Sequence, residues 1–411
     1  MNVTITPAQL EGTVIPPPSK SQAHRVLIAA ALSGGVSRID NVAFSQDIEA
    51  TMSCLEQLGA CFERDGNTVT VQGMGANAMS PMRRMAPPQL DCGESGSTLR
   101  FLIPVALAVR GGGIFSGRGR LMERPQKPYF DLFDEKGIFH EQKDGALTVQ
   151  GLLTPGEYRL PGNVSSQFVT GLLFALPLLK GNSKIVLTSP LESRGYVTMT
   201  LDALGLFGVY PEARETGFFI PGHQRYQSQN FAIEADWSQA GFWYAVRLLG
   251  SPVEVGGMDP GSAQGDRVIL DQYAKLSKPG DVEMDVSDCP DLVPPLAAMA
   301  ALRSGVTRLT KAARLRIKES DRLAAVTRVL GDLGADITEG PDSLTIRGKD
   351  CLTGGVKVDS FNDHRIAMMA AVAATRCVKP VTITGAECVA KSYPNYWEEY
   401  ESLGGKIRKS G

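Results

Sequence analysis

The stretch LEQLGACFERDGNTVTVQG (55–73) recurs in the same frame three more times, as FDEKGIFHEQKDGALTVQG (133–151), LGLFGVYPEARETGFFIPG (204–222) and LGDLGADITEGPDSLTIRG (330–348). In each copy an apparent helix ends at a glycine, which suits the left-handed residue that closes many helices. Two alternating segments separated by a turn follow, and a second glycine stands 14 positions after the first. The pattern predicts a helix followed by a β-hairpin. Chance recurrence is the alternative, and four copies with one interval argue against it.

The spacing of these glycines predicts the number of units. They stand at positions 59, 137, 208 and 334, with a truncated copy at 404, so the gaps are 78, 71, 126 and 70 residues. The long gap is nearly two periods, which predicts a sixth, degenerate unit around 265–290. Units of about 70 residues are too long for a solenoid repeat. We therefore expect an α/β (α+β) protein with six small units, three in each of two lobes.

Two polar, turn-rich stretches are candidate connections between the lobes, namely IPPPSK (15–20) and HQRYQSQN (223–230). If they are, one lobe covers residues 18–226. The other combines residues 1–17 with 227–411. The chain then crosses twice between the lobes, as a hinge requires, and the N-terminal strand joins the C-terminal half.

Composition narrows the class of protein. The 411 residues include 42 lysines and arginines against 44 acids, a formal charge of −2, and 43% are hydrophobic. This balance gives no reason to expect a nucleic-acid or membrane partner. The longest apolar runs, 101–109 and 168–179, fall short of the ~20 residues that span a bilayer, and no secretory signal is visible at the N-terminus. We expect a cytoplasmic protein without a metal site, because the seven cysteines form no CxxC pair and there is no HExxH motif.

Polar clusters stand directly before seven Ala/Leu-rich segments that read as helices. Helix N-termini expose unpaired N–H groups and attract anions. A serine or threonine at any one of them is explained equally well as an ordinary N-cap. Seven such starts, most with a Lys, Arg or Ser, indicate a small, highly charged anionic ligand. The segments are 18–32, 93–107, 163–176, 192–204, 289–302, 316–330 and 361–374.

Two of these clusters carry acids and bases together. In KESDR (318–322), Lys318, Glu319 and Arg322 have i,i+3 and i,i+4 spacing and should share one helix edge. The alternative is a solvated ion-pair face. FNDHR (361–365) places His364 beside an aspartate, where it could shuttle protons. An N-cap aspartate next to a structural histidine is the alternative there.

Two other stretches are basic. In PPPSKSQAHR (16–25) three prolines precede Lys20, and Ser21 and Arg25 share a helix face, which favours a functional role. The segment 111–128, GGGIFSGRGRLMERPQKP, alternates glycines with basic residues, a composition typical of a mobile loop that grips phosphate or carboxylate groups. A disordered surface loop is the alternative.

Taken together, these motifs resemble the 5-enolpyruvylshikimate-3-phosphate (EPSP) synthase family, the 3-phosphoshikimate 1-carboxyvinyltransferases. The resemblance rests on order and spacing from residue 16 to 397. It is carried by PPPSKSQAHR, ESGSTLR, GRLMERP, VSSQF, SRGY, KESDR, NDHR and AKSYPNYW.

The resemblance implies two lobes, each of three βαβαββ units. It also implies transfer of the enolpyruvyl group of phosphoenolpyruvate to the 5-hydroxyl of shikimate 3-phosphate, with release of phosphate, in the chorismate branch of aromatic amino acid biosynthesis. The family needs no metal or organic cofactor and is the target of glyphosate. We expect a monomer.

Residue roles follow from the resemblance position by position. Asp291 would accept the hydroxyl proton, Glu319 would protonate the methylene carbon with His364 as its neighbour, and Lys20 would touch both substrates. The implied ligands of shikimate 3-phosphate are Lys20, Ser21, Arg25, Ser165, Ser166, Gln167, Ser193, Tyr196, Asp291, Arg314 and Lys318. The implied ligands of phosphoenolpyruvate are Lys20, Gly96, Arg120, Gln167, Arg322, Arg365 and Lys391.

The chain departs from the best-known members at Glu94 and Arg314, which are Asn there, and at Ser97, which is Thr. Two other functions remain open at this point. UDP-N-acetylglucosamine enolpyruvyl transferase shares the fold, but its mobile loop carries a reactive cysteine, and segment 111–128 has none. A two-lobed anion-binding protein without activity would not need Asp291 and Glu319 among cations.

Overall fold

A computed structural model describes residues 1–75 and 86–411. The chain forms two compact units, here named the central unit (Pro18–Glu234) and the terminal unit (Met1–Pro17 with Ala235–Gly411). Residues far apart in sequence thus share the terminal unit, where the N-terminal strand β1 (Asn2–Thr6) pairs with two strands from the end of the chain.

The described residues of the central unit form three four-stranded sheets of one topology. In each, the first strand is parallel to the second, and a β-hairpin adds two antiparallel strands. The sheets are β14 (Phe231–Ala232), β3 (Val36–Asp40), β5 (Thr68–Gln72), β4 (Cys61–Asp65); β6 (Gln89–Asp91), β7 (Gly112–Ser116), β9 (Ala146–Gln150), β8 (Phe139–Lys143); and β10 (Glu157–Leu160), β11 (Ser183–Leu187), β13 (Gly217–Ile220), β12 (Glu212–Arg214).

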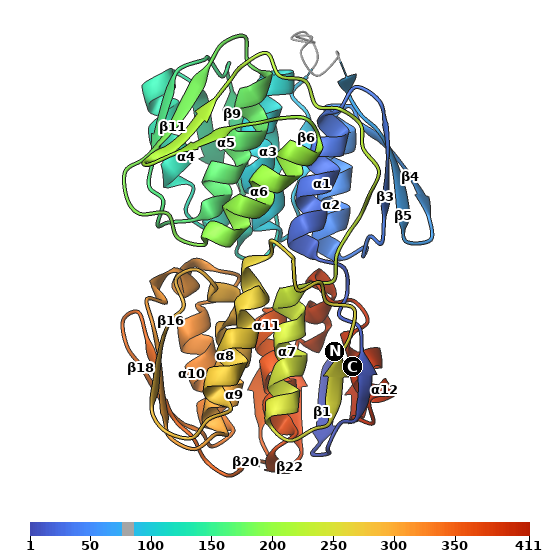
Figure 1. Ribbon diagram of the computed structural model, residues 1–411, viewed down its shortest axis with the longest axis vertical. Helices are drawn as coiled ribbons and strands as arrows, with labels where there is room; N and C mark the ends of the chain where they lie inside the picture. The colour runs from blue at the N-terminus through green and yellow to red at the C-terminus, as the bar shows by residue number, and fades with distance from the viewer. Residues whose placement is uncertain (76–85) are drawn as a thin grey trace. The chain divides into compact units, whose positions relative to one another are not determined.

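Two helices accompany each of these sheets, and five of the six run side by side (Figure 1). They are α1 (Lys20–Leu32) and α2 (Gln46–Leu58), α3 (Gly96–Arg110) and α4 (Lys127–Lys136), and α5 (Ser166–Ala175) and α6 (Arg194–Leu206). Contacts pass from α2 to α1 and α3, from α3 to α5, and from α5 and α1 to α6.

The terminal unit repeats the same plan twice. Its sheets are β16 (Val282–Asp285), β17 (Val306–Thr310), β19 (Leu344–Arg347), β18 (Asp336–Glu339), and β21 (Lys357–Asp359), β23 (Val381–Thr384), β1, β24 (Lys406–Ser410). The helices are α9 (Val293–Ala301) and α10 (Arg322–Asp332), then α11 (His364–Ala374) and α12 (Tyr396–Ser402). In the second sheet β1 takes the place that a hairpin strand holds elsewhere.

The sixth unit is reduced, as the glycine spacing indicated. It consists of the parallel pair β2 (Gly12–Val14) and β15 (Val253–Val255) with α7 (Trp237–Leu248) and α8 (Ile269–Leu276). Five residues separate α8 from β16, too few for a hairpin. Strands β20 (Leu352–Gly354) and β22 (Cys377–Lys379) form a further parallel pair. Along the chain, β20 comes directly before β21, and β22 comes directly before β23.

The second glycine has a shared steric reason in three of the four repeats. A Cβ at Gly73 would collide with the carbonyl of Ser33, and one at Gly348 with the carbonyl of Arg303. Gly222 approaches the carbonyl of Gly181 in the same way. The strand therefore passes close to the backbone at the end of an earlier element, and only glycine allows that approach.

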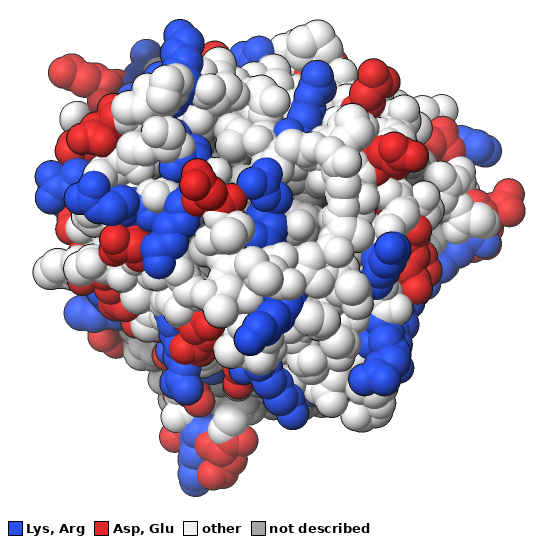
Figure 2. Space-filling view, turned by 90° about the horizontal axis from the view of Figure 1, so that it is seen from below, with Lys and Arg blue, Asp and Glu red and all other residues white. Residues whose placement is uncertain are grey.

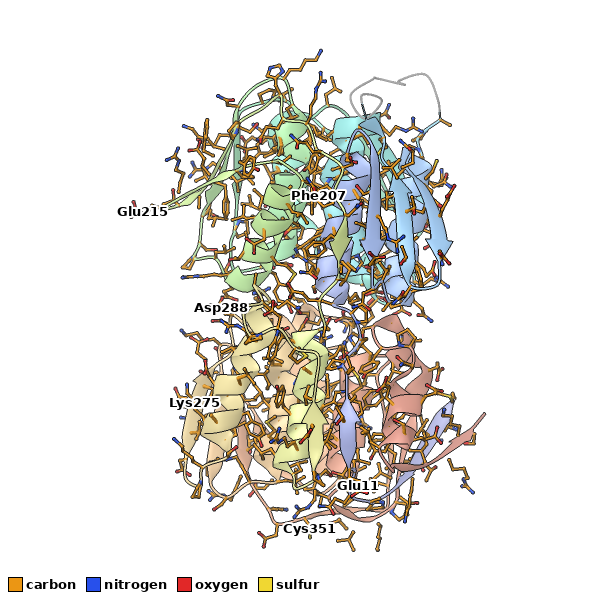
Figure 3. The ribbon with its side chains drawn as sticks, turned by 45° about the vertical axis from the view of Figure 1, so that its right-hand side comes forward. Glu11, Phe207, Glu215, Lys275, Asp288 and Cys351 are labelled. Atoms are coloured by element: carbon orange, nitrogen blue, oxygen red, sulfur yellow. The ribbon has the colours of Figure 1, made fainter. Side chains whose placement is uncertain are left out.

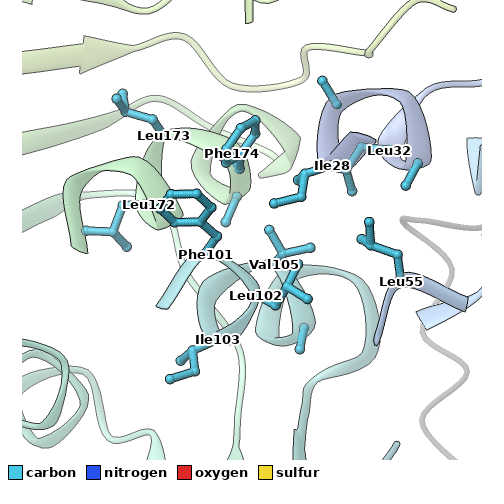
Figure 4. Close-up of a cluster of buried hydrophobic side chains, with 14 of the residues drawn as sticks. Ile28, Leu32, Leu55, Phe101, Leu102, Ile103, Val105, Leu172, Leu173 and Phe174 are labelled. Carbon is cyan, nitrogen blue, oxygen red and sulfur yellow. The ribbon is translucent and has the colours of Figure 1, made fainter. Parts of the chain in front are cut away.

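Each unit has its own apolar core. In the central unit, Phe101 and Leu102 of α3 pack among side chains of α1, α2 and α5, as Figure 4 shows. Helix α3 is buried along most of its length, so its N-terminal turn is held from several sides. No helix in the described ranges is long and apolar enough to cross a membrane.

The structure differs in detail from two expectations. We expected the second junction between the lobes to fall between residues 226 and 227. The compact central unit instead extends to Glu234, and its strand β14 pairs with β3. We also expected 111–128 to be one mobile loop. That was wrong for its first part, because β7 is a strand between β6 and β9, with Phe115 fully buried.

Candidate active site

Lys20 is the first residue of α1 and faces the start of α2. Ser19 caps α1 by accepting from the N–H of Gln22. The Lys20 ammonium lies 2.6 Å from the carboxylate of Asp47, in the first turn of α2, and both side chains are largely buried. Asp47 therefore fixes the direction of the lysine amine.

Arg25 lies one turn further along α1 and bridges to α6. Its Nε donates to Thr200 Oγ1 at 2.8 Å, and its two terminal nitrogens donate to the carbonyls of Ser21 and Tyr196. Burial lowers the pKa of Arg25 to about 10, against an opposing effect of Tyr196. These acceptors are neutral, so they position the guanidinium without neutralising its charge.

The start of α5 is tied to the start of α3. Gln167 donates from Nε2 to Ser97 Oγ at 3.1 Å and accepts at Oε1 from Arg100 at 2.8 Å. Ser165 is the N-cap of α5, with its hydroxyl accepting from the Gln167 N–H, and Ser166 is buried in the first turn. The amide of Gln167 is thus held at both ends.

Arg124 packs directly over Gly96, the first residue of α3. A Cβ at Gly96 would stand 2.6 Å from one terminal nitrogen of Arg124 and 2.9 Å from its Cζ. The arginine is buried, and its Nε has no hydrogen-bond partner among the described residues. A buried guanidinium with an unused donor is suited to an anionic ligand. Arg120 differs, because its side chain is 48% exposed and lies 3.7 Å from Glu123.

Ser193 precedes α6 with φ 55° and ψ 47°, in the left-handed region that residues with a Cβ seldom adopt. It is buried, and Tyr196 lies in the first turn of α6. Helices α1, α2, α3, α5 and α6 therefore present their N-termini at one end of the central unit, joined by the side chains described above.

Arg322 is the centre of the terminal unit's polar cluster. It begins α10 and is 1% exposed, yet it contacts three carboxylates. Nε lies 2.7 Å from Asp363, one terminal nitrogen 2.8 Å from Asp291, and the other 2.7 Å from Glu319. Burial alone would lower the pKa of Arg322, but these carboxylates raise it above its ordinary value.

Asp291 receives two further cations. It lies in a 3-10 turn just before α9, where Lys318 reaches one carboxylate oxygen at 3.3 Å and Arg365 the other at 3.2 Å. Arg365 also donates to Ser238 Oγ in the first turn of α7. Asp291 therefore lies among three cationic side chains at the point where α7, α9, α10 and α11 begin.

Lys318 has a perturbed pKa. Its pKa is lowered to about 8 because burial disfavours the ammonium. Asp291 and Glu319 oppose this shift, while Arg322 and Arg314 add to it. Arg314, at a position where the sequence departs from the family, is itself buried.

The rest of this cluster surrounds the start of α11. Asp363 is its fully buried N-cap, accepting from the Arg365 N–H and from Ser320 Oγ. His364 is buried, with Nδ1 4.0 Å from Asp363. Lys391 donates to the carbonyl of Asn362 at 2.6 Å. In Figure 3, Asp288 marks this end of the terminal unit, and Glu11 and Cys351 lie at the other.

One prediction of local structure was wrong. We expected Lys318, Glu319 and Arg322 on one helix edge, whereas α10 begins only at Arg322 and Asp321 is its N-cap. The three side chains still gather, because Lys318 and Arg322 both contact Asp291 and Arg322 contacts Glu319. The cluster is also largely buried rather than a solvated ion-pair face. By contrast, Figure 2 shows acidic and basic side chains interspersed on an outer face.

Comparison with known proteins decides the family. The family model for EPSP synthase (3-phosphoshikimate 1-carboxyvinyltransferase) matches residues 5–400. The chain belongs to the EPSP synthase family. It is 48% identical over 423 residues to the 3-phosphoshikimate 1-carboxyvinyltransferase of Clostridium kluyveri, covering 98% of each chain. It is 43% identical to that of Clostridium novyi, covering 99% of this chain and 98% of the relative.

The fold also matches that of a solved EPSP synthase. The structure of EPSP synthase from Acinetobacter baumannii superposes with a TM-score of 0.79 at 23% identity, covering 99% of this chain and 100% of that one. The protein is thus an enzyme of the shikimate pathway with 3-phosphoshikimate 1-carboxyvinyltransferase activity. The family's substrates are phosphoenolpyruvate and shikimate 3-phosphate.

Sequence reasoning about this EPSP synthase missed several residues. Asp47, Arg100 and Ser238 each hold one of the predicted residues by a direct hydrogen bond. Arg124 had a signal, since it lies within GRLMERP, but Arg120 of the same motif was chosen. The other three carry no signal of spacing, because their partners lie 27 to 127 residues away. Asp363 had been recognised in FNDHR as a possible N-cap, which it is, but its contact with Arg322 had not been predicted.

Proposed function

We propose that this EPSP synthase divides its work between two sets of residues, one in each unit. In the central unit Ser21, Arg25, Ser165, Ser166, Gln167, Ser193 and Tyr196 bind shikimate 3-phosphate, with Lys20 touching both substrates and Gly96 and Gln167 beside phosphoenolpyruvate. In the terminal unit Arg314, Lys318 and Asp291 serve shikimate 3-phosphate. There Arg322, Arg365 and Lys391 serve phosphoenolpyruvate.

The carboxylates of the terminal unit divide the proton transfers. Asp291 accepts the proton of the 5-hydroxyl, and Glu319 delivers a proton to the methylene carbon, with His364 nearby. A tetrahedral intermediate then loses phosphate. The observation that carries this assignment is that one guanidinium, Arg322, contacts both acids, one on each terminal nitrogen. Two acids held on different edges of one cation can face different atoms of a ligand.

Arg124 takes the place we first gave to Arg120 as the main phosphoenolpyruvate ligand of its segment. Arg124 is buried beside Gly96 with a free Nε donor, whereas Arg120 is half exposed and faces Glu123. A desolvated guanidinium binds an anion more strongly than an exposed one, because screening by water is weaker.

The matched pair Arg124→Ala and Arg120→Ala tests this choice. Steady-state phosphate release should show a rise of about 100-fold in the KM for phosphoenolpyruvate for Arg124→Ala, as expected when a buried charged contact is lost. Arg120→Ala should stay within about threefold of wild type. The reverse order would restore Arg120 to the role.

We also propose that the protein is cytoplasmic and monomeric. The first rests on its place in a biosynthetic pathway, and the second on each unit having its own core. Light scattering during size-exclusion chromatography should give a mass near 44.0 kDa. A mass of twice that value would contradict a monomer.

A further inference from the structure

A chain of buried hydrogen bonds runs behind the proposed ligands of the central unit. His24 of α1 meets Thr51 of α2 through Nδ1 and Oγ1 at 2.8 Å. Thr51 Oγ1 lies 2.6 Å from Thr98 Oγ1 of α3. Thr98 Oγ1 then reaches Ser95 Oγ, the N-cap of α3, at 2.7 Å. His24, Thr51 and Thr98 are fully buried.

The chain connects two residues that the proposed function places at phosphoenolpyruvate. At one end, Ser95 caps α3 immediately before Gly96. Next to Ser95 in the hydrogen-bond chain, Thr98 also lies 3.4 Å from the backbone carbonyl of Asp47, whose carboxylate holds Lys20. The N-terminal halves of α1 and α2 are thereby joined to the first turn of α3 through buried side chains.

The direction of the protons follows from counting donors. A threonine hydroxyl has one proton, and Thr98 donates its own to Ser95 Oγ. Thr98 must then accept from Thr51. Thr51, having used its proton, must accept from the Nδ1–H of His24. A neutral imidazole carries one N–H, so Nε2 is left bare.

Two observations support a neutral ring of this form. Nε2 of His24 is buried and has no hydrogen-bond partner among the described residues. Burial, followed by the charges of Lys20 and Arg25, holds the pKa of His24 well below its usual value. The ring also stands edge-on to Phe101 of α3, with ring centres 6.4 Å apart. Thr51 Oγ1 lies at Nδ1, whereas no acceptor among the described residues lies at Nε2, so the single proton of the neutral ring is stabilised on Nδ1.

We propose that His24, Thr51 and Thr98 are positioning residues that fix the N-terminus of α3, with Gly96, against Lys20 on α1. They touch no substrate themselves. The proposal rests on the roles proposed for Gly96 and Lys20 in binding phosphoenolpyruvate. Because five of the eight proposed ligands of shikimate 3-phosphate in the central unit lie at the N-termini of α5 and α6, a loss of this chain should act mainly on phosphoenolpyruvate.

The kinetic test uses near-isosteric variants. Thr51→Val keeps the shape and removes the hydroxyl, and Thr51→Ser keeps the hydroxyl. We expect Thr51→Val to raise the KM for phosphoenolpyruvate about tenfold, since misplacement of about 1 Å costs on the order of 100-fold in a well-ordered site. The KM for shikimate 3-phosphate should change by less than about threefold, and Thr51→Ser should restore wild-type values.

The matched control is Thr307→Val in the terminal unit. Thr307 is fully buried on β17 and accepts from Arg303, so its variant also loses a buried hydrogen bond. It should leave the KM for phosphoenolpyruvate unchanged. An equal rise in both KM values for Thr51→Val, no rise in either, or the same effect from Thr307→Val would overturn the proposal.

A second measurement is made on the wild-type protein and does not depend on the role of Gly96. In protein labelled with ¹⁵N-histidine, long-range ¹H–¹⁵N correlation should show His24 as the Nδ1–H tautomer at neutral pH. His24 is identified among the four histidines by its absence from the spectrum of His24→Gln. An Nε2–H tautomer would contradict the chain. If Gly96→Ala leaves the KM for phosphoenolpyruvate unchanged, the proposed role of Gly96 is contradicted. The tautomer of His24 still tests whether the hydrogen-bond chain runs as proposed.

Discussion

Asp363 holds Arg322 along one edge of the guanidinium, with Nε 2.7 Å from Oδ2 and a terminal nitrogen 3.3 Å from Oδ1, and both side chains are almost wholly buried. This contact orients the guanidinium so that its terminal nitrogens face Asp291 and Glu319. The orientation of both proposed proton-transfer acids therefore depends on a residue that need not touch substrate.

Asp363→Asn should lower both stability and turnover. Asparagine can still cap α11, but it leaves Arg322 with one buried negative partner fewer. Breaking a buried ion pair costs about 3–5 kcal/mol. We expect urea unfolding to show a loss of that order, and kcat to fall more than either KM rises. Unchanged kcat in the folded variant would show that Arg322 needs no such orientation.

Lys318 predicts an alkaline limit to activity. In the free enzyme its pKa is about 8, so above that pH the side chain loses its positive charge. Phosphate groups complete their ionisation near pH 6 and do not titrate in this range. The value of kcat/KM for shikimate 3-phosphate should therefore fall above about pH 8.

Lys318→Arg provides the control, because arginine keeps its charge at that pH. Its profile should lack the fall. Arg314→Asn removes a nearby positive charge that lowers the pKa of Lys318, so the fall should move to higher pH. If Lys318→Arg follows the wild-type profile, another group is responsible.

Gly96→Ala should act through Arg124. The new methyl group would stand within 3 Å of the guanidinium, which must move away. We expect the KM for phosphoenolpyruvate to rise several-fold and inhibition by glyphosate to weaken further. In a double-mutant cycle the effect of Gly96→Ala should shrink once Arg124 is alanine, because contacting residues are not additive. Full additivity would rule out Arg124 as the mediator.

The repeating units of the fold could be predicted from the sequence because the same local constraints recur in it. The repeated glycines at 59, 73 and their counterparts report a local constraint, a helix end or a close backbone approach, that recurs in each unit. The reduced sixth unit was visible only as a long gap. Its missing hairpin could not be inferred, because an absent element leaves no pattern.

The candidate site was predictable in a different way. Residues at helix starts, such as Lys20 and Arg322, stand in local motifs that mark them. Asp47 and Ser238 do not, because each acts through a contact between helices far apart in sequence. The choice of Arg120 over Arg124 failed for the same reason, since burial beside Gly96 is a tertiary property.

Asp291→Asn should lower turnover much more than it weakens substrate binding. Removing a general base costs on the order of 100-fold or more in turnover. The amide keeps one acceptor oxygen in place of the two that Lys318 and Arg365 contact, and Arg365 keeps its bond to the backbone carbonyl of residue 291, so the KM values should change less than kcat. A kcat within about threefold of wild type would show that Asp291 is an ion-pair partner alone.

The most direct test of the division between Asp291 and Glu319 is the exchange of solvent deuterium into the methylene group of phosphoenolpyruvate. It is followed by NMR in D₂O after shikimate 3-phosphate starts the reaction, with wild type, Asp291→Asn and Glu319→Gln compared. If Glu319 delivers the proton to carbon, Glu319→Gln should suppress this exchange as well as turnover. Exchange at the wild-type rate in Glu319→Gln would contradict the account, and Lys20 or His364 would then have to supply the proton.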